Sequence, residues 1–151
     1  MIRIAHRGNT KGPNPLEENK PEYLLQAVND GYDCEVDVWL IDNEIWLGHD
    51  RPDYKVDKEF ISNPRFWNHA KNLNALHYML ENKIHCFWHE GDERTLTSKG
   101  YIWTYPYKEV TEKSIICLQH ELDVAPQGCL GICSDWPNDQ NDVHNIEGYP
   151  V

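Results

Sequence analysis

The stretch Asp33-Cys34-Glu35-Val36-Asp37-Val38-Trp39-Leu40 alternates with a period of two. This alternation predicts a strand whose apolar side chains point to one face, while the carboxylates of Glu35 and Asp37 point to the other. Carboxylates on a strand are by themselves typical of a solvated face. Here, however, His6-Arg7-Gly8 lies upstream at the end of another short strand, and Gly48-His49-Asp50 follows just downstream. Two carboxylates flanked by two histidines favour phosphoester chemistry with a metal ion and an acid/base pair.

Length and composition predict one globular domain spanning residues 1–151. The chain is 40% hydrophobic and contains 6 Trp and 8 Tyr residues, which favours a packed core over a disordered chain. Its net charge of -11 makes duplex nucleic acid an improbable partner, because too few cations are present to neutralise a phosphate backbone. The same charge fits either a site that concentrates a divalent cation or an acidic surface kept for solubility.

Sequence features also bear on location. No apolar run reaches the length of a membrane span, and residues 1–6 begin directly with a strand rather than with a signal peptide. We therefore expect a cytoplasmic protein without a membrane span. The five cysteines are an odd number in mostly apolar runs, which favours buried thiols in a reducing compartment. Cys129 and Cys133 have no matching second pair, so a zinc site is disfavoured.

The first forty residues predict a strand, a helix and a second strand. Residues 2–6 form the first strand. Asn19 is placed as a helix N-cap, with Pro21 in the first turn and Glu22 completing a capping-box pattern. Asp30-Gly31 ends the helix, with glycine just past the last turn. A strand–helix–strand opening usually places its two strands in parallel.

A hairpin follows the acidic strand. If Asp42-Asn43-Glu44 forms a three-residue loop, Ile41 pairs with Ile45, and His49 then lies opposite Asp37 on the same face. A two-residue loop would turn His49 to the other face, because one step of register exchanges the two faces of a strand. We expect the three-residue loop.

The remainder of the chain is rich in short strands. Residues 50–72 are polar with scattered aromatic residues, and we expect an ordered excursion over the site. A second helix is predicted around 73–80, and a short helical turn around 93–98. Further strands are predicted at 84–89, 101–104, 114–118 and 130–134. The pattern amounts to about seven strands and only two good helices.

Several motifs follow one another in a recognisable order. They are His6-Arg7-Gly8, Glu18-Asn19 before a helix, Glu35-Val36-Asp37, Gly48-His49-Asp50 and Gly131-Ile132-Cys133-Ser134-Asp135-Trp136-Pro137. In this order and spacing the chain resembles the glycerophosphodiester phosphodiesterase family, within the wider group of phosphatidylinositol-phospholipase-C-like phosphodiesterases. The resemblance is strong over the first fifty residues and weaker at 131–137. Lys20 stands where that family has a threonine.

The resemblance implies a fold and a reaction. A full (β/α)8 barrel needs at least about 200 residues, so the expected fold is a reduced or incomplete TIM-like (β/α) barrel with several helices missing. The implied activity is a metal-dependent phosphodiesterase acting on a small, glycerophosphodiester-like substrate. It implies that His6 and His49 share the acid/base roles. Arg7 would hold a phosphate oxygen, or form a salt bridge to Glu18, or do both.

Other residues are expected around the substrate. Glu18 and Asn19, at the start of the helix, are expected on the substrate side of the site. Trp136 either packs against the substrate or belongs to the core. Four histidines lie outside any motif and are interpreted as surface or packing residues: His69, His77, His120 and His144.

The implied cofactor is one divalent cation, Mg2+ or Ca2+. Glu35 and Asp37 are suitable oxygen ligands on one strand face. The family's third metal carboxylate, usually in a Glu-x-Lys strand, has no clean counterpart in this sequence. His89 and Glu90 are the candidates for that position, with Asp92 as a further one.

Three alternatives remain open from the sequence. A phospholipase-D-like lyase that releases a cyclic phosphate would use the same residues. A catalytically inactive binding module on the same fold would explain the missing Glu-x-Lys strand. An acidic partner-binding protein could use residues 50–72 for its contact. The substrate headgroup and the oligomeric state are not specified by the sequence.

Overall fold

The computed structural model describes residues 1–138. Within these residues the chain forms one ten-stranded mixed sheet and three helices. Their bounds are β1 Ile2–His6, α1 Pro21–Asn29, β2 Asp33–Ile41, β3 Glu44–Leu47, β4 Tyr54–Val56, α2 Lys58–Ile61, β5 Phe66–Ala70, α3 Leu73–Glu81, β6 Cys86–Phe87, β7 Arg94–Leu96, β8 Ile102–Thr104, β9 Ser114–Leu118 and β10 Gly131–Ser134.

Seven parallel strands form the central part of the curled sheet. β1 pairs in parallel with β2 on one side and with β10 on the other, so the first and last strands are neighbours. From β2 the parallel pairing continues to β5 and β6, and from β10 to β9 and β8. β3, β4 and β7 are antiparallel additions. The carboxyl ends of seven parallel strands therefore lie at the same end of the sheet.

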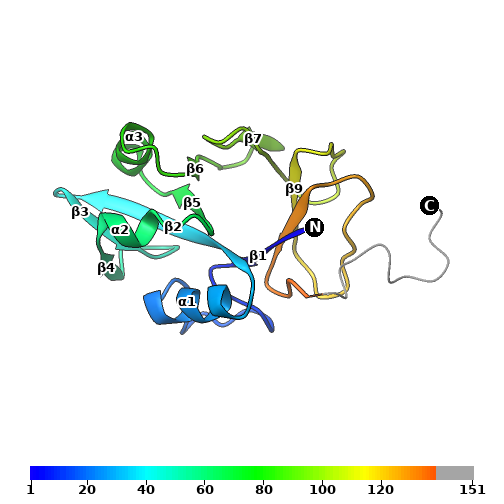
Figure 1. Cartoon of the computed structure of the whole chain (residues 1–151), viewed down its shortest axis with the longest axis horizontal. Helices are drawn as coiled ribbons and strands as arrows, with labels where there is room; N and C mark the ends of the chain where they lie inside the picture. Colours follow the sequence, from blue (N-terminus) through cyan, green and yellow to red (C-terminus); the bar gives the residue numbers. More distant parts are fainter. Residues whose placement is uncertain (139–151) are drawn as a thin grey trace.

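The expected TIM-like barrel, even in reduced form, is wrong. The structure is a curled mixed sheet that makes a half-barrel, and strands and helices do not alternate along it. All three helices lie along the half of the sheet that contains β2 and β5 (Figure 1). The connections from β8 to β9 (residues 105–113) and from β9 to β10 (residues 119–130) contain no helix. These parallel strands are therefore joined by loops rather than by the helical crossovers that a TIM-like barrel needs.

Three apolar clusters pack against the sheet, the smallest of which comprises Ile116, Leu118, Ala125 and Ile132. On the outer face, Leu24 and Ala27 of α1 and Met79 of α3 pack against Cys34, Val36 and Val38 of β2. The second cluster joins side chains from six strands: Ile4, Trp67, Phe87, Trp103, Ile115 and Cys133. The alternation of β2 therefore has the predicted consequence, with its apolar residues on one face and its carboxylates on the other. The carboxylate face, however, is not solvated, since Glu35 is 3% exposed and Asp37 0%.

The β2–β3 hairpin has a two-residue loop, and the expected three-residue loop is wrong. Ile41 pairs with Glu44, so only Asp42 and Asn43 form the turn. Both have positive φ angles, 50° and 62°. This conformation suits short polar side chains and matches the twist of the flanking strands.

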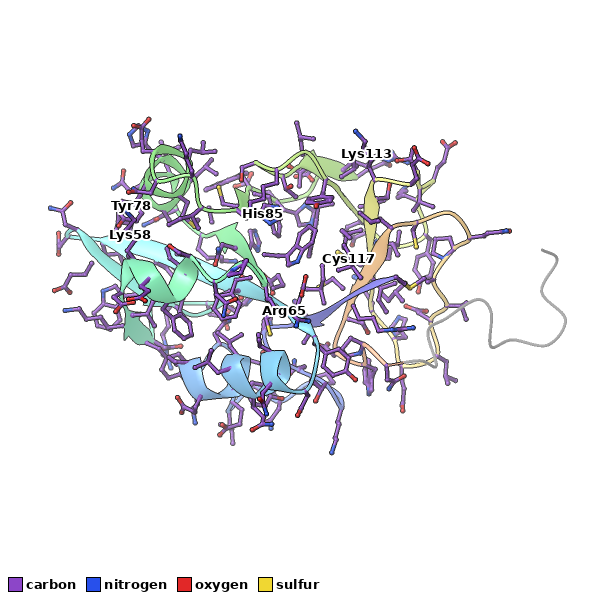
Figure 2. The ribbon with its side chains drawn as sticks, viewed as in Figure 1. Lys58, Arg65, Tyr78, His85, Lys113 and Cys117 are labelled. Atoms are coloured by element: carbon purple, nitrogen blue, oxygen red, sulfur yellow. The ribbon has the colours of Figure 1, made fainter. Side chains whose placement is uncertain are left out.

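Residues 50–72 are more regular than expected. They contain β4, the short helix α2 and, in Phe66–Ala70, a strand that pairs along β2. Asp33 anchors this strand, because it accepts hydrogen bonds from Arg65 Nε and Trp67 Nε1, each at 2.9 Å. Figure 2 labels Arg65 where the chain enters β5. Among the described residues, no helix is long and apolar enough to cross a membrane.

Candidate metal and acid/base site

Three side chains converge between the middle of β2 and the carboxyl end of β5. Glu35 and Asp37 lie on one face of β2, and His69 is the register partner of Asp37 on β5. His69 Nδ1 lies 3.3 Å from Asp37 Oδ1 and 3.6 Å from Glu35 Oε1. One ligand atom from each residue can be chosen so that all three lie within 4.8 Å of one another, close enough to share one metal ion.

The ring of His69 is held in one orientation. Its Nε2 lies 3.0 Å from the carbonyl oxygen of His89, which can only accept, so Nε2 carries the proton. Its plane stacks on Phe87 at 7° with the ring centroids 5.1 Å apart. These two contacts turn Nδ1 toward the carboxylates. A histidine that donates one ring nitrogen to a backbone carbonyl is typical of metal ligation through the other.

Without a metal, the carboxylates make His69 a cation. Burial favours the neutral ring, but hydrogen bonds to Asp37 and Glu35 outweigh it and raise the pKa of His69 to about 9. Burial likewise opposes ionisation of Asp37, yet His69, Arg7 and Asn19 hold the pKa of Asp37 well below its usual range. The pair is therefore ionised at neutral pH. Glu35 Oε2 and Asp37 Oδ1 are buried, and each makes only an ion-pair contact with a histidine, at 3.8 Å to His6 and 3.3 Å to His69, without a well-formed hydrogen bond.

Asn19 supports Asp37 and does not cap the helix as expected. The N-cap of α1 is Lys20, which makes no side-chain capping bond. Asn19 has a φ of 65° and is buried. Its Nδ2 donates to Asp37 Oδ2 at 2.8 Å, and its Oδ1 accepts from the Asp37 backbone N–H at 3.0 Å. The left-handed conformation turns the amide into the site, where it orients the carboxylate.

His6, at the end of β1, is held by Asp135. Its Nδ1 donates to Asp135 Oδ1 at 2.8 Å, and its Nε2 lies 3.8 Å from Glu35 Oε2. Burial lowers the pKa of His6, but the bond to Asp135 and the charge of Glu35 outweigh burial and raise it. Asp135 lies directly after β10, so the pairing of the first and last strands creates this dyad.

Arg7 lies between two acidic groups. Its Nη1 donates to Glu18 Oε2 at 3.2 Å, and its Nε lies 3.4 Å from Asp37 Oδ2. The salt bridge to Glu18 was one of the two expected roles of Arg7 and is present. Asn9 links Glu18 to Asp135 by donating to both carboxylates, at 2.9 and 2.8 Å. The motif residues around β1 thus form one hydrogen-bonded network.

His49 reaches the site by a different route from the expected register. With a two-residue hairpin loop, its strand position would turn it away, but β3 ends at Leu47. At Gly48 the chain turns sharply, and a Cβ there would overlap the carbonyl oxygen of Arg51. The turn brings His49 to the cavity beside His6. Its Nδ1 lies 2.8 Å from Asp50 Oδ1, and its side chain is 40% exposed.

The candidates for the third ligand lie at the rim. His89 Nδ1 bonds to Asp92 Oδ1 at 2.7 Å, and Glu90 is exposed. Both His89 and Glu90 line the cavity, but His69 is the residue grouped with the β2 carboxylates. His69 was expected to be a surface or packing residue; it does stack on Phe87, but it also contacts both carboxylates.

The other expected positions are less central. The indole of Trp136 lies close to Gly12 on the loop after β1. His77 is exposed on α3, and His120 lines the cavity. His144 lies outside the described residues.

A cavity of about 620 Å3 opens above these residues. Besides the metal-ligand group it is lined by Lys71, which makes no ion pair with any of the described residues. Sequence reasoning missed His69 and Lys71 as site residues because β5 was not recognised as a strand.

Comparisons with known proteins do not place the chain in a family. No family model, no curated protein and no solved structure matches it. The candidate site therefore stands on its own geometry.

Proposed function

We propose that this protein is a metal-dependent phosphodiesterase that cleaves small phosphodiesters, with glycerophosphodiesters as the leading class. The observation that carries the proposal is the group Glu35, Asp37 and His69 beside His6. A buried acidic and imidazole cluster next to a second, carboxylate-supported histidine combines a cation site with an acid/base group. The resemblance of the motif order supports the same reading.

The residues fit a divalent cation. Two carboxylates and one imidazole form a mixed oxygen and nitrogen donor set, which Mg2+ and Mn2+ accept when water completes the coordination. The weak partnering of the buried oxygens Glu35 Oε2 and Asp37 Oδ1 is explained if they are ligands, because buried polar atoms in proteins rarely lack a good hydrogen bond. When bound, the cation would neutralise charge that develops on the phosphoryl oxygens.

The protein's own groups would move the protons. With Nδ1 donating to Asp135, neutral His6 has a lone pair on Nε2, which faces into the site and can accept a proton from a nucleophilic hydroxyl or water. His49, which lines the same cavity and is more exposed, would protonate the leaving alkoxide. This division of roles fits the structure, in which Asp135 holds His6 in place and His49 is more exposed to solvent.

Two positively charged side chains, those of Arg7 and Lys71, can interact with the phosphate of the substrate. Arg7 is held by Glu18 and Asp37, so its position is set before substrate binds. Lys71 lines the cavity without an ion-pair partner among the described residues. A diester carries one negative charge, and these groups supply a balancing field in an otherwise acidic protein.

The test is hydrolysis of bis(p-nitrophenyl) phosphate and glycerophosphocholine with Mg2+, Mn2+ or Ca2+, and with EDTA. We expect turnover only with a metal, and a loss of at least about 100-fold in His6→Ala, since a general acid or base contributes that much. His77→Ala is the matched control, because His77 is exposed on α3 away from the site. Equal inertness of wild type and His6→Ala with every metal would favour a binding module. Phosphorus NMR of the products separates hydrolysis from release of a cyclic phosphate.

A further inference from the structure

Two cavities meet at the acid/base residues. The inner cavity, of about 620 Å3, lies over the β5, β6, β8 and β9 ends. The outer cavity, of about 680 Å3, lies between the 13–19 and 48–54 loops. Four residues line both: His6, Arg7, His49 and Asp135. A phosphoryl group at this junction would have room on both sides.

One wall of the inner cavity is apolar and aromatic, while the buried carboxylates of Glu35 and Asp37 line another part of it. Phe87 and Trp103 are buried in its wall and stack with centroids 4.4 Å apart at 26°. Leu118 and Cys133 are also buried, and Cys117 (labelled in Figure 2) lies beside Cys133 in the β9–β10 register. Tyr105 is 43% exposed and closes this wall toward solvent. Such a wall suits a flat, apolar group, because aromatic rings stack with offset or edge contacts.

The outer cavity has a different character. Its lining is polar, with Glu18, Asn19, Asp50, Arg51 and Asp53. Tyr54 of β4 also lines it, and its hydroxyl makes no hydrogen bond to any of the described residues. This surface offers both donors and acceptors to a group that carries hydroxyls.

Resting on the proposed function, we propose that the substrate is a phosphodiester with two unlike arms, one a flat aromatic alcohol in the inner cavity and the other a polar alcohol in the outer cavity. Tyr105 and Tyr54 are then specificity-determining residues for the two arms. A monoester fills only one cavity and forgoes the contacts of the other.

The experiment measures kcat/KM on three diesters with the metal-loaded protein. They are 2,3-dihydroxypropyl p-nitrophenyl phosphate, methyl p-nitrophenyl phosphate, and methyl 2,3-dihydroxypropyl phosphate, which has no aromatic arm. Tyr105→Ala should lower kcat/KM about five-fold on the two nitrophenyl diesters and leave the third unchanged, the size expected for one aromatic contact. Tyr107→Ala is the control: Tyr107 is 72% exposed on the same loop and is not among the lining residues of either cavity.

The second arm is tested separately. Tyr54→Phe should lower kcat/KM about three-fold on diesters that carry the dihydroxypropyl arm, as one lost hydrogen bond predicts, and not on methyl p-nitrophenyl phosphate. Equal effects of Tyr105→Ala and Tyr107→Ala, or effects of Tyr54→Phe that ignore the polar arm, would overturn the two-arm inference while leaving phosphodiesterase activity established. Absence of turnover on all diesters with every metal would overturn the proposed function and this inference together.

Discussion

His69 Nδ1 lies 3.3 Å from Asp37 Oδ1 across two paired parallel strands. The contact joins residues far apart in the sequence and is enforced from both sides. The Asp33 carboxylate fixes the start of β5, and the His89 carbonyl and the Phe87 ring fix the histidine. In the absence of a metal the imidazolium of His69 balances part of the negative charge of the two carboxylates. A bound metal cation would supply that positive charge instead, with Nδ1 of His69 as one of its ligand atoms.

Metal binding should depend on His69 more than on the rim residues. A ligand that binds only the folded state at 100 times its Kd stabilises by about 2.7 kcal/mol, which corresponds to a rise in melting temperature of several degrees. We expect that rise with Mn2+ or Mg2+ in the wild-type protein. It should be largely lost in His69→Gln and kept in His89→Ala and Glu90→Gln. Retention of the full shift in His69→Gln, measured by differential scanning fluorimetry with EDTA as reference, would assign the third ligand elsewhere.

The stability of the metal-free protein should fall on the alkaline side. Because the pKa of His69 is raised from 6.5 to about 9 on folding, its contribution is fully present below pH 6.5. That contribution is lost as pH rises through about 9. Asp37 acts in the opposite direction: its lowered pKa contributes above its unfolded value of 3.8 and is lost in stronger acid. Urea unfolding in EDTA at several pH values should show a maximum between these limits.

His69→Gln provides the comparison for that profile. The variant lacks the titrating group, so the decline between pH 6.5 and 9 should flatten. An unchanged decline would assign the alkaline loss of stability to another group.

Asn19 should contribute more to the stability of the fold than its position before helix α1 suggests. Asn19→Gly keeps a residue that tolerates the positive φ and removes both hydrogen bonds to Asp37. Since a hydrogen bond to a charged group contributes about 1.5–3 kcal/mol, we expect a loss of about 2–4 kcal/mol in the free energy of unfolding. Asn43→Gly, at another positive-φ position in an exposed turn, is the control and should change stability little. Urea denaturation of the two variants gives the comparison.

Asp135 should tune His6 without being needed for the fold. Asp135→Asn keeps the shape of the side chain but replaces the hydrogen bond to a carboxylate, which raises the pKa of His6, with a bond to a neutral amide. We expect kcat/KM to fall by at least about ten-fold. The acidic limb of the pH–rate profile should also move to lower pH, because His6 then loses its proton more easily.

The parallel change at His49 is the control. Asp50→Asn removes the carboxylate beside His49, but the side chain of Asp50 is 91% exposed, so the effect of its charge is screened by solvent. We expect little change in the profile. Equal shifts in the two variants would contradict the assignment of Asp135 as the specific partner of His6.

The sequence by itself determined the local part of this protein. The alternation of β2, the strand at 2–6, the helix ending near Gly31 and the strands at 114–118 and 130–134 follow from periodicity and turn residues, and they are present. These elements depend mainly on residues that are close together in the sequence, so the pattern of residue types along the chain is enough to predict them. The motif residues His6, Arg7, Glu35 and Asp37 also meet, because they lie on neighbouring parallel strands or just after one. His49 joins them only through the turn at Gly48.

Only the tertiary structure decided how the site is completed. His69 becomes the third member of the cluster through the β2–β5 register, and Asp135 becomes the partner of His6 because β10 returns beside β1. The curl of the sheet without alternating helices, the two-residue hairpin and the inward turn of Asn19 were likewise not readable from periodicity. Each depends on pairings between distant segments, whose free energy comes from burial and hydrogen bonds that no local stretch contains.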